Sequence, residues 1–116
     1  MSELEELRVR IGNFARERDW DQFHSPKNLA MALIVEAGEL LEHFQWLKQS
    51  ESFELPPHKL EAVAEELADI LVYLVRIADQ LGIDLVSATD RKIEVNESKY
   101  PADKVRGSAR KYTEYR

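Results

Sequence analysis

Apolar residues recur every three or four positions along most of this chain, and that period predicts α-helices with little or no sheet. Four helices are expected, over residues 3–18, 26–48, 58–81 and 85–99. Ser25 followed by Pro26 is a typical helix start, because Ser caps free backbone amides and Pro suits the first helical position. Gly82 is expected to end the third helix, and Asp84 to cap the fourth.

The second and third predicted helices form the expected centre of the fold. The middle of the second is apolar nearly all round, which is typical of a buried helix. The third carries a seam with alternating spacings of three and four, the pattern of a helical bundle, at Leu60, Val63, Leu67, Ile70, Leu74, Ile77 and Leu81. A short linker at 49–57 makes the two helices antiparallel neighbours. The sequence therefore predicts an all-α, four-helix bundle-type fold over residues 1–101, followed by a basic, extended C-terminal tail at 102–116.

Composition narrows the class of protein. The 116 residues are 44% hydrophobic and 33% charged, as expected of one globular domain. There is no cysteine, which excludes disulfides and thiolate metal sites and is compatible with the cytoplasm. No apolar run reaches the ~18 residues of a membrane span. The net charge is −6, and residues 102–116 hold five basic and two acidic residues, so the preceding residues carry −9. We therefore expect neither a membrane nor a nucleic acid polymer as partner.

Two short acidic pairs stand out within the apolar stretches. Glu36 and Glu39 lie in A-L-I-V-E-A-G-E-L-L, and Glu66 and Asp69 lie in E-E-L-A-D-I-L-V-Y-L. Residues three apart share a helix face, so each pair presents two carboxylates side by side. Ionised carboxylates on an apolar face need a partner, and these stretches hold no matching set of Lys or Arg. Mg²⁺ prefers such oxygen ligands, so the four acids predict a metal site, with Mn²⁺ as a possible substitute.

Other candidate residues have alternative explanations. Trp46 could stack on a base or belong to a core or interface. Lys92 and Asn96 could meet a phosphate or a base edge, or form a solvated stripe near a helix end. A di-iron oxidase bundle is disfavoured, because neither His24 nor His43 completes the Glu-x-x-His pair that such sites use.

Several segments together resemble one known family. The acidic pairs, with R-D-W-D-Q-F-H-S-P-K-N-L-A, V-E-A-G-E-L-L-E-H-F-Q-W and R-G-S-A-R-K-Y-T, are similar to the all-α nucleoside triphosphate pyrophosphohydrolases of the MazG-like superfamily, in particular the dCTP pyrophosphatase branch. The resemblance covers residues 14–114. It implies Mg²⁺-dependent hydrolysis of a deoxynucleoside triphosphate, dCTP or a modified dCTP, to the monophosphate and pyrophosphate, as house-cleaning of the nucleotide pool.

The resemblance also implies roles for particular residues. Glu36, Glu39, Glu66 and Asp69 fall on the metal-ligand and catalytic positions. The expected nucleotide contacts are His24, Trp46, Tyr73, Lys92 and Asn96. A cytoplasmic tetramer, a dimer of dimers with sites built between subunits, is expected. The competing hypothesis from another class is a non-catalytic helical interaction module that uses the seam of the third helix.

Overall fold

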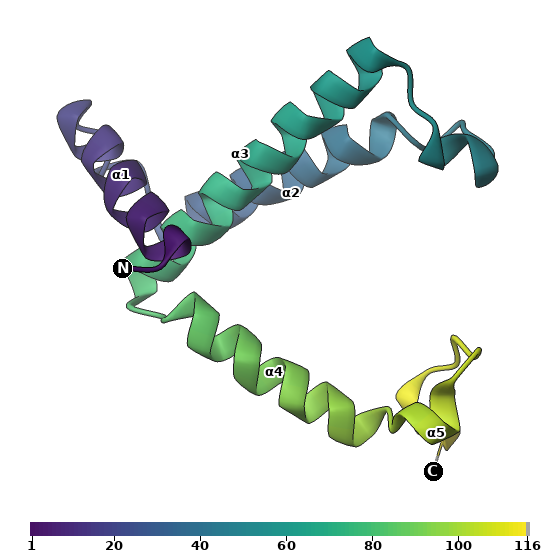
Figure 1. The fold of residues 1–116 in the computed structure, drawn as a ribbon. Helices are drawn as coiled ribbons and strands as arrows, with labels where there is room; N and C mark the ends of the chain where they lie inside the picture. Colours follow the sequence, from purple (N-terminus) through teal and green to yellow (C-terminus); the bar gives the residue numbers. More distant parts are fainter. Residues whose placement is uncertain (116) are drawn as a thin grey trace. The chain divides into compact units, whose positions relative to one another are not determined.

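The computed structural model describes residues 1–115, and all regular structure within them is helical (Figure 1). The main helices are α1 (Glu3–Glu17), α2 (Pro26–Glu42), α3 (Pro57–Leu81) and α4 (Leu85–Lys99). Shorter turns follow at η1 (Ser50–Phe53), α5 (Ala102–Val105) and η2 (Tyr112–Tyr115). The predicted all-α class is confirmed.

The helix boundaries follow from local chemistry. The Ser25 hydroxyl accepts a hydrogen bond from the Asn28 amide at 3.1 Å, and the Asp84 carboxylate accepts one from the Ser87 amide at 3.0 Å. Both caps satisfy amides that the first helical turn leaves free. Gly82 has φ 65°, a left-handed conformation that glycine adopts without a steric cost. These three predicted boundary residues are confirmed.

One predicted helix end and the predicted conformation of the C-terminal segment differ from the structure. The second helix ends at Glu42 and not near residue 48, because the backbone tightens there. The amides of His43 and Phe44 bond to carbonyls three residues back, which is typical of a helix that closes with a tighter last turn. The segment 102–115 is also not extended throughout, since it contains α5 and η2.

The chain divides into two compact units, Met1–Ile83 and Asp84 onward. In the first unit, α2 and α3 lie side by side and antiparallel, and α1 packs on α3. The buried apolar core of this unit is small. It consists of Ala15, Leu29, Val63, Val75 and Ala78. The predicted antiparallel pairing of the second and third helices is confirmed.

The predicted seam of α3 splits into two rows with a seven-residue repeat. Val63 is buried and Ile70 and Ile77 are partly buried, as a bundle seam requires. The other row, which we call the heptad row, is 40–57% exposed. It consists of Leu60, Leu67, Leu74 and Leu81. Four of the seven predicted seam residues are therefore left exposed by the first unit's own helices.

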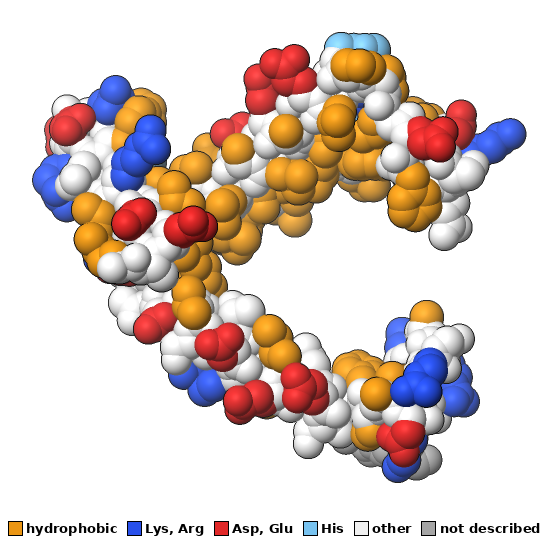
Figure 2. Space-filling view, viewed as in Figure 1, with side chains coloured by type: hydrophobic (Ala, Val, Ile, Leu, Met, Phe, Trp, Pro, Cys, Tyr) orange, Lys and Arg blue, Asp and Glu red, His pale blue; other side chains and the backbone are white. Residues whose placement is uncertain are grey.

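Helix α2 has a similar uncovered stripe. Met31, Ile34, Val35 and Leu41 are all at least half exposed, so a helix that is apolar nearly all round is covered on only part of its surface. Apolar side chains run along much of the α2–α3 pair (Figure 2). A side chain at Gly38 would meet no atom within 4 Å in the described part of the chain. Among the same residues, no helix is long and apolar enough to cross a membrane.

Candidate active site

The antiparallel pairing of α2 and α3 brings three of the four predicted acids together. Carboxylate oxygens of Glu36 and Glu39 on α2 and of Glu66 on α3 all lie within 4.8 Å of one another. The first two share a helix face because they are three residues apart. The third is added by the neighbouring helix, so the group depends on the register of α2 against α3.

Asp69 lies outside this tight group and its side chain is exposed. Its charge nevertheless reaches the group, because it helps to raise the pKa of Glu36 and of Tyr73. The fourth predicted acid thus belongs to the same electrostatic environment, at a longer distance than the other three.

The pKa of the Glu36 carboxyl is raised above its ordinary value. Its closeness to the Glu66 carboxyl is the main cause, and partial burial and the charges of Glu66 and Asp69 act in the same direction, while its closeness to Glu39 opposes them. Carboxylates this close repel one another, and a proton or a cation must relieve that repulsion. The structure therefore favours a bound positive charge at this position.

The donor set fits a hard divalent cation. Among the described residues, Oε2 of Glu36 and Oε2 of Glu66 are buried side-chain oxygens without a hydrogen-bond partner. Such atoms are costly to bury unsatisfied. The group offers only carboxylate oxygens, which Mg²⁺ and Mn²⁺ prefer as ligands. Glu36, Glu39 and Glu66 could hold such an ion.

Two predicted nucleotide contacts lie in the same unit as the acids. Tyr73 is one turn beyond Asp69 on α3, and burial raises the pKa of its hydroxyl, with further contributions from Glu36 and Asp69. Trp46 lies in the turns that follow α2, and its side chain is 87% exposed. The expectation that it belongs to a helix is therefore wrong, but its indole is accessible to a ligand.

His24 is placed differently. It precedes α2, and the rise of about 1.5 Å per residue separates Pro26 from Glu36 by about 15 Å along the axis. Its ring accepts a hydrogen bond from the buried Arg76. One chain therefore does not bring His24 to its own acidic group.

The polar cluster around Arg76 was not predicted. This side chain contacts Asp21 and His24 in the connection between α1 and α2, and Asp79 on α3 itself. The signal was present in the sequence, because Arg76 interrupts an apolar stretch of α3 and Asp79 follows it three residues later.

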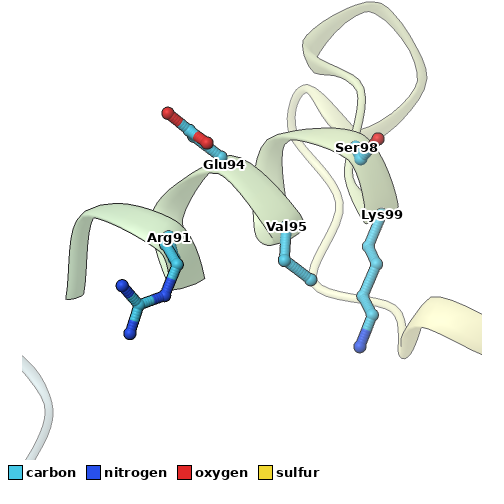
Figure 3. A pocket seen from close by; sticks show the side chains of 5 residues that line it. All are labelled: Arg91, Glu94, Val95, Ser98 and Lys99. Atoms are coloured by element: carbon cyan, nitrogen blue, oxygen red, sulfur yellow. The ribbon is translucent and has the colours of Figure 1, made fainter. Parts of the chain in front are cut away.

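Lys92 and Asn96 lie on α4 in the second unit, where they share one side of the helix by their spacing of four. An open hollow lies beside the same helix (Figure 3). Its lining residues are Arg91, Glu94, Val95, Ser98 and Lys99, so it includes neither predicted contact. The hollow gives no independent support for their role.

The chain is similar to several known proteins. The MazG-like family matches residues 31–115. Proteins named dCTP pyrophosphatase 1 from Mus musculus and Homo sapiens are each 46% identical over 113 residues, which is 96% of this chain and 66% of theirs. The chain thus spans slightly less than two thirds of those relatives. A crystal structure described as a pyrophosphatase from Archaeoglobus fulgidus is 41% identical, with a TM-score of 0.81, over 87% of this chain and 94% of that one. The chain belongs to the MazG-like family.

Proposed function

We propose that this protein hydrolyses a deoxynucleoside triphosphate, dCTP or a modified dCTP, to the monophosphate and pyrophosphate. The observation that carries the proposal is the group of Glu36, Glu39 and Glu66, with two buried carboxylate oxygens that lack a hydrogen-bond partner among the described residues. Relatives named dCTP pyrophosphatase 1 match 96% of the chain and support the nucleotide class.

The acids have two tasks in this reaction. A divalent ion held by Glu36, Glu39 and Glu66, with Asp69 nearby, would neutralise phosphate charge and lower the pKa of water when bound. One of the four carboxylates accepts the proton from the attacking water, as a general base. The bond between the α- and β-phosphoryl groups breaks, and pyrophosphate leaves. Mg²⁺ is the proposed cation, with Mn²⁺ as its substitute.

The nucleotide contacts are proposed from the family resemblance and from exposure. Trp46 offers an accessible ring on which a base can stack. Tyr73 lies near the acids. For Lys92 and Asn96 on α4, the family resemblance alone carries the proposed contacts, through a cation and an amide. Pro26, two residues after His24, is about 15 Å from Glu36 along the α2 axis, so we propose that His24 contacts nucleotide held by another subunit.

The proposal includes self-association. The exposed heptad row on α3 and the exposed stripe on α2 form apolar surfaces of the kind that mark interfaces. A homo-oligomer, expected to be a tetramer arranged as a dimer of dimers, would cover them. Neither a nucleic acid polymer nor a membrane is expected as partner, and the cytoplasmic location stays a prediction.

The test is pyrophosphate release from a panel of deoxynucleoside and ribonucleoside triphosphates and 5-substituted dCTPs, with and without Mg²⁺. Glu66→Gln should abolish Mg²⁺-dependent turnover. Glu65→Gln is the matched control, because Glu65 is the adjacent, exposed acid outside the group and should keep wild-type activity. Full turnover in the Glu66 variant would contradict the site. No turnover with any triphosphate would favour a non-catalytic interaction module, for which the heptad row provides a surface.

A further inference from the structure

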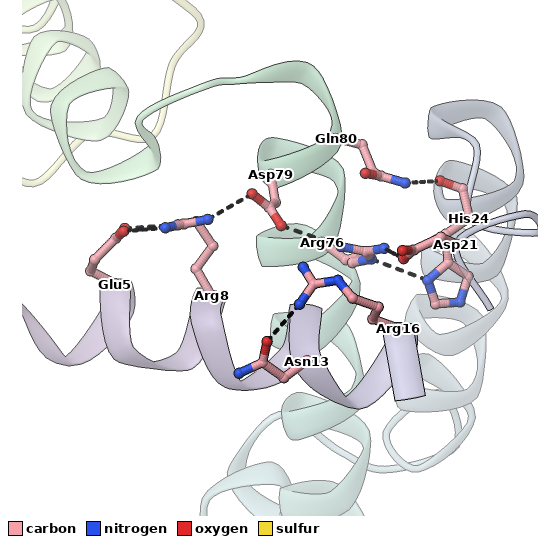
Figure 4. Close-up of polar contacts among 9 residues, drawn as sticks. All are labelled: Glu5, Arg8, Asn13, Arg16, Asp21, His24, Arg76, Asp79 and Gln80. Carbon is pink, nitrogen blue, oxygen red and sulfur yellow. Dashed lines mark hydrogen bonds and ion pairs between the residues drawn. The ribbon is translucent and has the colours of Figure 1, made fainter. Parts of the chain in front are cut away.

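Arg76 is a buried cation, 5% exposed, at the centre of a polar cluster far along α3 from the acidic group (Figure 4). Its Nε donates to Nδ1 of His24 at 3.1 Å, and its Nη1 donates to Oδ2 of Asp79 at 3.2 Å. Its Nη2 donates to Oδ1 of Asp21. The guanidinium therefore joins α3 to the connection between α1 and α2 through two separate side chains.

The hydrogen bond to His24 determines which ring nitrogen carries the proton. An arginine side chain stays protonated and can only donate. Nδ1 of His24 must then be the acceptor, so the neutral ring carries its proton on Nε2. A proton on Nδ1 would abolish this bond and place a second positive charge beside Arg76.

The other charged groups of the cluster are already engaged. The second oxygen of Asp79 accepts from Arg8 of α1 at 2.9 Å, and Arg8 pairs with Glu5. A Cβ at position 12 would be in ordinary van der Waals contact with Asp79 Oδ2, at 3.6 Å, so α1 lies directly against this part of the cluster. Asp21 is the remaining anion near His24, and Arg76 already holds one of its oxygens.

The electrostatics, like the hydrogen-bond geometry, favour the neutral form of His24. Burial lowers the pKa of His24, the charge of Arg76 lowers it further, and the charge of Asp21 opposes them. Since the folded-state pKa lies below the value of about 6.5 in an unfolded chain, the unfolded state binds more protons near that pH. The contribution of neutral His24 to the stability of the folded state is therefore present above about pH 6.5 and is lost as the pH falls through the folded-state pKa.

The backbone around His24 also holds the connection between α1 and α2 in place. The backbone carbonyl of His24 accepts from Nε2 of Gln80 on α3 at 2.7 Å. The amides of Phe23 and His24 bond to the carbonyl of Trp20, at 2.9 and 3.1 Å, and form the turn that leads into α2. Contacts to α3 from residues 21 and 24 thus anchor the start of α2.

We propose that Arg76 and His24 form a proton-sensitive clamp, in which Arg76 holds the neutral, Nε2-protonated ring and protonation of His24 releases the segment at residues 22–25 from Arg76. Arg76 keeps Asp21 and Asp79 when this happens, so the imidazole leaves and the guanidinium stays. The released segment therefore lies between the anchored Asp21 and the start of α2, and α1 remains attached through Arg8 and Asp79.

The direct test is a pH titration of ¹⁵N-labelled protein by long-range ¹H–¹⁵N NMR, which reports the tautomer and the pKa of each histidine. We expect His24 as the Nε2–H tautomer, with a pKa below 6.5, and a higher pKa in Arg76→Met. The exposed His58, near the other end of α3, is the internal reference for the comparison. An Nδ1–H tautomer, or a His24 pKa that is the same in both proteins, would overturn the clamp.

Amide hydrogen exchange tests the release, and does not depend on how well the Arg76 variant folds. Between about pH 7 and 5, protection of the Phe23 and His24 amides, corrected for intrinsic rates, should fall in the wild type. It should stay constant in His24→Asn, whose Oδ1 can accept from Arg76 without titrating in this range. An equal loss of protection in both proteins would show that another group controls the connection.

Discussion

Replacing Leu67 by Gln should weaken self-association while leaving the helices intact. Leu67 belongs to the heptad row of α3 and is 52% exposed. Full burial of a leucine contributes about 1.5–3 kcal/mol, so covering its exposed half contributes about 1 kcal/mol. A two-fold contact buries the same side chain in both copies. The association therefore loses about 2 kcal/mol, which is about a 30-fold increase in the dissociation constant.

Glutamine is chosen because its helix propensity is close to that of leucine. Burial of its amide without a partner adds to the loss, so about 30-fold is a lower bound. Sedimentation velocity over a range of concentrations measures the association, and circular dichroism checks the helices. Val9→Gln, at an exposed apolar position of α1 outside the row, is the control. A wild-type protein that is monomeric at micromolar concentration, or equal weakening by both substitutions, would refute the reasoning.

Three further outcomes are expected. Mg²⁺ should raise the thermal midpoint by binding the folded state, and Glu39→Gln should remove most of that increase in a thermal-shift assay. Trp46→Ala should raise KM for all four dNTPs by about 5- to 150-fold, from the ~1–3 kcal/mol of base stacking, and an unchanged KM would place Trp46 in an interface. Asn96→Ala should instead narrow the preference for dCTP over the other dNTPs. Arg76→Met should lower the free energy of unfolding, measured in urea, by about 2–3 kcal/mol. Breaking a fully buried ion pair costs ~3–5 kcal/mol, and the loss is smaller here because the Asp partners of Arg76 reach water. Arg10→Met, at an exposed site, is the control and should change the free energy of unfolding by less than about 0.5 kcal/mol.

Local signals in the sequence were sufficient for most helix boundaries. Ser25, Gly82 and Asp84 act through groups within a few residues of themselves, so their effect can be read without knowing the fold. The end of α2 was misjudged for the opposite reason. Apolar and aromatic residues continue past Glu42 at helical spacing, and the tightening of the backbone at His43 has no marker such as Gly or Pro.

The acidic group was predictable because each pair lies within one helix and the two helices are joined by a short connection. Sequence spacing gave Glu36 beside Glu39, and antiparallel pairing gave Glu66 opposite them. Sequence spacing did not give the position of Asp69 along the helix axis relative to the other acids, because that position depends on the register of the two helices. The cluster around Arg76 was missed because Arg76 lies 52 residues from His24 and 55 residues from Asp21 along the chain, and only its spacing of three from Asp79 forms a local pattern.

The exposed surfaces and the acidic group are connected through α2. Gly38 lies between Glu36 and Glu39 and has open space where a side chain would be, although glycine within a helix costs about 1 kcal/mol relative to alanine. That cost is offset if the backbone of another subunit approaches there, since glycine permits close contact. The approaching subunit would then come within one helical turn of the acids. It follows that dilution and Leu67→Gln should reduce pyrophosphate release in parallel with the loss of oligomer. Full specific activity in a dissociated protein would instead show that one chain holds the complete site.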